Sequence, residues 1–140
     1  MIILDTDHIS YLQWGGPEGR AISRRLDEAG LAEPITTIVS YEEQMRGWLG
    51  KIHGAEKLVD EVRFYGKLQE QFEFYKRLVV LDFSEKAAVE LQRLRAMRIR
   101  VATMDLKIAA IALANDATLW SRNLRHFSKV PGLRVEDATV

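Results

Sequence analysis

Carboxylates from three distant parts of the chain lie next to apolar segments that are expected to be buried. Asp5 directly follows the first apolar run, and Glu42 and Glu43 come a few residues after a β-branched run. Asp105 opens a segment that is apolar on nearly every side. A single acid in a first helical turn is commonly a cap or a partner of the helix dipole. Three acids that meet at one place indicate a shared chemical role.

A group of buried carboxylates calls for a cation, because burial and mutual repulsion both disfavour the charged form. Mg²⁺ and Mn²⁺ prefer oxygen ligands, whereas zinc sites are usually built with Cys or His. The chain has no cysteine and only three widely spaced histidines. Asp5, Asp105 and one of the two glutamates therefore predict a Mg²⁺ (or Mn²⁺) site, which would suit hydrolysis of phosphodiester bonds.

Other chemistries lack the residues that they need. The sequence has no G-x-x-x-x-G-K-[ST] phosphate loop, no G-x-G-x-x-G dinucleotide motif and no G-x-S-x-G serine hydrolase elbow. The absence of cysteine also excludes a disulfide scaffold and a thiol nucleophile. A phosphatase or nucleotide-binding domain of the same fold class is therefore a weaker hypothesis than the metal site.

Apolar runs alternate with helical patterns along the whole chain, whose 140 residues predict a single domain over 1–140. The predicted strands are 1–4, 34–39, 78–81, 117–120 and 133–135, and the longer helical patterns are 17–29, 40–49, 55–77, 84–97 and 104–114. Strands that alternate with helices pair in parallel through right-handed crossovers. We therefore expect a three-layer α/β/α sandwich around a central parallel sheet of four to five strands. Ligands of such sheets bind at the carboxyl ends of the strands.

Four short motifs occur in order along the chain. They are Ile3–Ser10, Thr37–Gly47, Asp105–Ala114 and Ala117–Leu133, and Glu43 precedes Gly47 by four residues in the second of them. Together they resemble the PIN-domain ribonucleases, and especially the VapC toxins of bacterial toxin–antitoxin pairs. The resemblance covers essentially the full chain and selects Glu43 over Glu42.

The resemblance implies a metal-dependent endoribonuclease that acts as a toxin. The implied residues are Asp5, Glu43 and Asp105 for catalysis and metal binding, Thr6, Ser40 and Asn123 in support, and Arg122, Arg125 and His126 for RNA binding. It also implies a homodimer and a small antitoxin protein as a partner. The alternative is a PIN-like module that binds RNA or a protein without cutting.

The closing motif departs from the family pattern. The family often has a fourth acid at one of two positions, which hold Asn123 and His126 in this chain. An amide oxygen can still contact a metal, but it carries no charge. We therefore expect one firmly bound cation and a weak or absent second one, and Asp7 is the first candidate to replace the missing acid.

The formal charges balance, with 20 Lys and Arg against 20 Asp and Glu, but their distribution is uneven. Residues 1–85 carry 10 basic and 15 acidic groups, and residues 86–140 carry 10 basic and 5 acidic groups. This asymmetry predicts either a basic face for RNA in the C-terminal half or ordinary solvated helix surfaces.

The segment 55–75 has many aromatic residues, which predicts a surface that is half core and half partner groove, unless all of them are core.

No apolar run approaches the roughly 20 residues that a membrane span needs, so no membrane partner is expected. Asp5 and Asp7 interrupt the N-terminal segment where a signal peptide would be apolar. The expected location is the cytoplasm.

Overall fold

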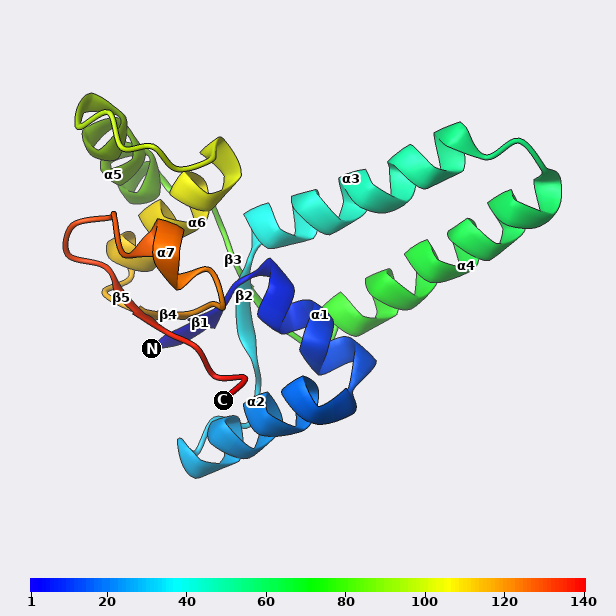
Figure 1. Cartoon of the computed structure of the whole chain (residues 1–140), viewed down its shortest axis with the longest axis horizontal. Helices are drawn as coiled ribbons and strands as arrows, with labels where there is room; N and C mark the ends of the chain where they lie inside the picture. The colour runs from blue at the N-terminus through cyan, green and yellow to red at the C-terminus, as the bar shows by residue number, and fades with distance from the viewer.

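Five three-residue strands form the centre of the computed structural model, which describes residues 1–140 (Figure 1). They are β1 (Ile2–Leu4), β2 (Ile35–Thr37), β3 (Val79–Leu81), β4 (Thr118–Trp120) and β5 (Arg134–Glu136). Backbone hydrogen bonds join them in two parallel groups, ordered β1-β4-β5 and β2-β3. The two groups lie side by side through β1 and β2, where the Thr36 hydroxyl donates to the Leu4 carbonyl oxygen over 2.8 Å. The predicted α/β fold with a central parallel sheet of four to five strands is confirmed, except that hydrogen bonds divide the five strands into a group of three and a group of two, with a seam between them.

Helices cover both faces of the strands, as the three-layer prediction requires. The helices are α1 (Thr6–Trp14), α2 (Gly16–Glu28), α3 (Ile38–Gly54), α4 (Leu58–Tyr75), α5 (Glu85–Ala96), α6 (Thr103–Ala114) and α7 (Leu124–Phe127). Successive strand residues point to opposite faces. Ile3 and Leu119 therefore join the core formed with α5 and α6, while Leu4 and Trp120 join a second core with α1 and α2.

The second strand is shorter than its β-branched sequence predicts. β2 ends at Thr37, and the predicted strand residues Ile38 and Val39 are the first residues of α3. The Thr37 side chain accepts a hydrogen bond from the Ser40 backbone N–H over 3.0 Å and so caps the helix. The helix therefore starts two residues earlier than predicted, because a side-chain cap overrides the strand propensity of the residues that follow it.

Helices α3 and α4 form an antiparallel hairpin that projects away from the strands (Figure 1). Helix α4, at Leu58–Tyr75, is shorter than the helix predicted over 55–77. Several of its apolar side chains are exposed, including Leu58, Val62, Tyr65 and Phe72. The interpretation of this segment as wholly core is therefore wrong, while the partner groove stays a prediction. None of the helices is both long enough and apolar enough to cross a lipid bilayer.

Candidate active site

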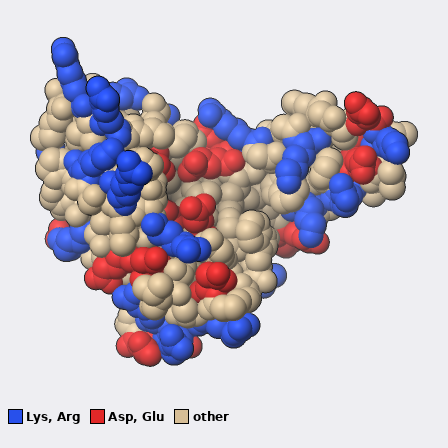
Figure 2. All heavy atoms as spheres, in the orientation of Figure 1, with Lys and Arg blue, Asp and Glu red and all other residues tan.

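A small acidic cavity of about 210 Å³ lies where β1 ends and where α3 and α6 begin. Its lining side chains are Asp5, Thr6, Asp7, Glu43, Asp105, Ile108 and Asn123. Figure 2 shows acidic side chains gathered in the hollow between the main body and the α3–α4 hairpin. All three predicted catalytic acids therefore face one cavity, although 100 residues separate the first from the last.

Asp5 is fixed at the junction of β1 and α1. Its backbone N–H donates to the carbonyl oxygen of Trp120, and its carboxylate caps α1 by accepting from the His8 N–H over 2.9 Å. The fully buried His8 ring accepts a hydrogen bond from the Ala138 N–H at Nε2. In the neutral ring the hydrogen is then on Nδ1, which lies 3.4 Å from Oδ1 of Asp5. The sequence-based site did not include His8, whose only signal is its position three residues after Asp5.

Of the two adjacent glutamates, Glu43 lines the cavity. Its Oε1 accepts a hydrogen bond from the Thr6 hydroxyl over 2.7 Å, which places Thr6 in a supporting position. Glu42 instead pairs with Arg46 over 2.7 Å on the outer surface of α3. Successive helical residues differ in direction by about 100°, so only one of the two side chains can face the cavity.

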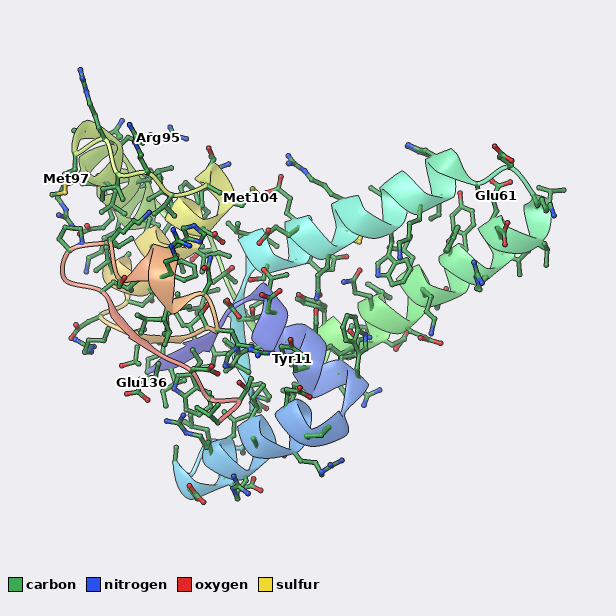
Figure 3. The ribbon with its side chains drawn as sticks, viewed as in Figure 1. Tyr11, Glu61, Arg95, Met97, Met104 and Glu136 are labelled. Carbon is green, nitrogen blue, oxygen red and sulfur yellow. The ribbon has the colours of Figure 1, made fainter.

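Asp105 reaches the cavity from the first turn of α6, which packs beside α3. Figure 3 labels its neighbour Met104 at the start of α6, on the side of that helix toward α3. Asn123 donates from Nδ2 to Oδ2 of Asp105 over 3.4 Å, and its Oδ1 lies 2.7 Å from Nδ1 of His126. The asparagine at the position of the missing fourth acid therefore bridges Asp105 and an exposed imidazole.

Asp7 is a fourth acid in the cavity that the predicted set of site residues does not include. It lies two residues after Asp5, in the first turn of α1, and its side chain lines the same cavity. The signal in the sequence is the pair of aspartates in a single helical turn. The structure therefore gives the cavity four carboxylates despite the neutral Asn123.

The carboxylates of this cavity disfavour one another's ionisation. Burial raises the pKa of Glu43, and the charges of Asp105, Asp5 and Asp7 raise it further, against the Thr6 hydrogen bond. Burial also raises the pKa of Asp105, as does the charge of Asp5, while His126 opposes the effect. The pKa of Asp7 is raised by burial and then by Asp5. A bound cation would relieve this repulsion.

The other predicted residues lie outside the cavity. Ser40 is fully buried, and its hydroxyl lies 3.2 Å from that of Thr37 at the base of α3, so it contacts no carboxylate of the site. Arg122 is exposed, and its guanidinium donates to the Tyr11 hydroxyl over 2.8 Å. Arg125 and His126 are exposed on α7. Arg122 lies near enough for its charge to act on Asp7, and His126 likewise acts on Asp105.

The side chains present fit a hard divalent cation. The charged donors that line the cavity are all carboxylates, which Mg²⁺ and Mn²⁺ prefer. In the present arrangement no three acidic or histidine side chains already form a ligand set. Mg²⁺ keeps several water ligands, so some of these carboxylates would hold the ion through water. The fold and the site define an α/β protein with a carboxylate-lined cavity at the ends of its strands.

The chain belongs to the PIN domain family, whose model matches residues 2–133. A curated relative is the tRNA(fMet)-specific endonuclease VapC of Salmonella typhimurium, which is 34% identical over 90 residues. These residues are 61% of this chain and 66% of that protein, so the match spans slightly less than two thirds of the relative's length.

Solved structures share the fold over nearly the entire chain. VapBC-1 from nontypeable Haemophilus influenzae has a TM-score of 0.77 and 23% identity, with 100% of both chains covered. DNA-bound VapBC from Salmonella typhimurium has a TM-score of 0.70 and 28% identity, with 98% of this chain and 97% of that chain covered. The PIN-like fold that the four motifs predict is confirmed.

Proposed function

We propose that this PIN domain is a Mg²⁺- or Mn²⁺-dependent endoribonuclease of the VapC type. The observation that carries the proposal is the convergence of Asp5, Glu43 and Asp105 on one cavity in which burial and mutual repulsion raise carboxylate pKa values. The name of the Salmonella relative, an endonuclease specific for a transfer RNA, supports RNA as the substrate class.

Each side chain has a distinct part in this proposal. Asp5, Glu43 and Asp105 hold the cation, while Thr6 orients Glu43 and Asn123 orients Asp105 through their hydrogen bonds. A bound cation would act as a Lewis acid, which activates water for attack on phosphorus and offsets charge on the leaving oxygen. The exposed residues Arg122, Arg125 and His126 contact phosphates on either side of the cleaved bond.

Purified protein tests this proposal with a labelled single-stranded RNA. We expect cleavage with Mg²⁺ or Mn²⁺, none with EDTA, and loss of cleavage in Asp5→Asn. The matched control is Asp116→Asn, since the Asp116 side chain is 93% exposed and pairs with Arg134 away from the cavity. Cleavage in EDTA, or equal cleavage by Asp5→Asn and the control, would show that the cavity is not the catalytic centre.

The partners are part of the same proposal. The structural neighbours are VapBC toxin–antitoxin complexes, and the α3–α4 hairpin has an apolar hollow lined by Tyr41, Met45, Tyr65, Leu68, Gln69 and Phe72. We place a small antitoxin protein in this hollow and expect the chain alone to be a homodimer in the cytoplasm. Light scattering of the chain alone and of the co-expressed pair measures both states.

A further inference from the structure

A second cavity, of about 370 Å³, lies between α1 and the α3–α4 hairpin. It differs from the apolar hollow of the hairpin, because eight of its ten lining residues are not hydrophobic and the two hollows share no residue. Amides and hydroxyls come from Ser10, Gln44 and Gln71, and Lys51, Lys67 and Glu70 give it one net positive charge. A volume of this size is within the range of small-ligand sites.

Two tryptophans form the aromatic part of this cavity. Trp14, at the end of α1, is 71% exposed, and Trp48 lies across from it on α3. The Lys51 ammonium lies 4.6 Å from the centre of the Trp48 ring. The exposed Trp14 indole offers a flat stacking surface, and Lys51, which covers one face of the half-buried Trp48 ring, adds a charge for phosphate.

The floor of the cavity is a buried amide network with one unused acceptor. Gln44 donates to the Ser10 hydroxyl over 2.6 Å and accepts from Gln71 over 2.8 Å and from Tyr75 over 2.7 Å. Gln71 is only 2% exposed, and its Oε1 has no hydrogen-bond partner. A buried acceptor without a partner is costly. Because Oε1 of Gln71 is itself closed to solvent, a ligand that donates a hydrogen bond would reach it only after this side chain turned toward the cavity.

The cavity continues the acidic site along the same two helices. Thr6 joins Glu43 across α1 and α3, and one helical turn further along α1 Ser10 joins Gln44, the next residue of α3. Four residues of helix correspond to about 6 Å. A nucleotide next to a phosphate held at the acids would therefore lie within reach of this cavity.

We propose that this second cavity binds one unstacked nucleobase of the RNA, next to the phosphate at the acidic site. The inference rests on the proposed nuclease function and adds a base subsite to it. Single-stranded RNA is recognised by bases that stack on aromatic side chains and form hydrogen bonds at their edges. The indoles supply the stacking, Gln71 and its neighbouring amides supply the edge contacts, and Lys51 and Lys67 attract the flanking phosphates.

The lining favours a nucleobase over a segment of a partner protein. An amphipathic partner helix needs a largely apolar groove. The apolar hollow of the hairpin provides such a groove, and this cavity does not. The polar floor, with its unused acceptor, instead fits a planar group that has hydrogen-bond donors on its edge.

Two glycines of α3 give a matched test. Gly47 lines the cavity and Gly50 does not, and a Cβ atom at either position meets nothing within 4 Å. Leucine is a better helix former than glycine, so both Gly47→Leu and Gly50→Leu should fold. Only Gly47→Leu fills the cavity. Quenching of tryptophan fluorescence by a single-stranded RNA oligonucleotide in EDTA reports binding without cleavage, since the third tryptophan, Trp120, is buried.

We expect wild type and Gly50→Leu to be quenched equally by the oligonucleotide and much less by an abasic oligonucleotide of the same length. Gly47→Leu should bind about tenfold more weakly, with a similar rise in KM for cleavage in Mg²⁺. Trp14→Ala, at an exposed position, should have the same effect if Gly47→Leu fails to fold.

The remaining outcomes separate the two proposals. Cleavage by wild type, with equal quenching and KM for Gly47→Leu and Gly50→Leu, would overturn the base subsite and leave the nuclease function standing. Failure of wild type to cleave RNA in Mg²⁺ or Mn²⁺ would overturn the nuclease function itself. If Gly47→Leu binds RNA normally but escapes a co-expressed antitoxin, the cavity belongs to the protein partner and the base subsite is wrong.

Discussion

The Thr6 hydroxyl donates a 2.7 Å hydrogen bond to Oε1 of Glu43 and so connects α1 to α3 across 37 residues of sequence. Thr6 follows Asp5 directly, so the start of α1 both carries Asp5 and orients Glu43. The bond lowers the pKa of Glu43, against burial and the neighbouring carboxylates, which raise it. This contact therefore offsets part of the rise in the pKa of Glu43 that its surroundings cause.

Replacing Thr6 should change the pH dependence of cleavage. Thr6→Val removes the hydrogen bond, so the pKa of Glu43 rises further and the acid limb of the kcat/KM profile moves to higher pH. Thr6→Ser keeps the hydroxyl and should keep the wild-type profile. A profile for Thr6→Val that is unchanged, or displaced to lower pH, would show that Glu43 does not control the acid limb.

The two adjacent glutamates should behave oppositely. Glu43→Gln should reduce kcat/KM for RNA by about 100-fold or more, because a ligand of the cation is lost. Glu42→Gln loses only the exposed pair with Arg46, and exposed pairs contribute little, so cleavage should stay within about twofold. The reverse pattern in steady-state kinetics would mean that the other glutamate holds the cation.

The metal-free protein should become more stable when one acid of the cavity is neutralised. The folded-state pKa values of Asp105, Glu43 and Asp7 are raised, so folding is disfavoured above those values and the penalty disappears as pH falls through them. Asp105→Asn should therefore raise the thermal midpoint in EDTA at pH 7, by about 3 °C for each kcal/mol of repulsion removed. Calorimetry should show the difference shrinking at lower pH.

Mg²⁺ should reverse the order of these two proteins. A ligand that binds only the folded state raises the midpoint by an amount that grows with the logarithm of its affinity, so wild type should gain more than Asp105→Asn. Asp116→Asn should follow wild type in both conditions, because its acid lies outside the cavity. A destabilised Asp105→Asn protein in EDTA would mean that its hydrogen bond to Asn123 outweighs the repulsion.

Restoring an acid at position 123 should strengthen metal binding. Calorimetric titration of wild type should show one firm Mg²⁺ or Mn²⁺ site and a weak or absent second, and Asn123→Asp should tighten binding by about tenfold. Two tight sites in wild type would contradict the expectation and identify Asp7 as the replacement acid. In that case Asp7→Asn should remove one of the two sites.

The strand positions and the buried helix α6 were predictable because runs of apolar residues determine them locally. The end of β2 was not, since Ile38 and Val39 have strand propensity and only the Thr37 cap turns them into helix. The same Thr37 cap explains why Ser40 does not support the site. Its hydroxyl pairs with that of Thr37 and lies outside the cavity.

The three acids could be found from the sequence because each lies beside a strand or a buried helix. The sequence indicates Asp7 only as a candidate replacement for the missing acid and gives no role to His8, because which face of the first turn of α1 meets the cavity depends on how α1 packs against α3 and on the contact with Ala138. Long-range contacts of this kind leave no periodic pattern in the chain.

The seam between β1 and β2 has a mechanical consequence for the cavity. Asp5 is attached to the β1-β4-β5 group, whereas Glu43 is attached through α3 to the β2-β3 group. At their junction the two groups are joined by the side-chain hydrogen bond from Thr36 to Leu4 rather than by a strand ladder, and the bonds from α1 to α3 add to it. An ion held by both acids would link the two strand groups. Amide exchange in β1 and β2 should then slow together when the ion binds.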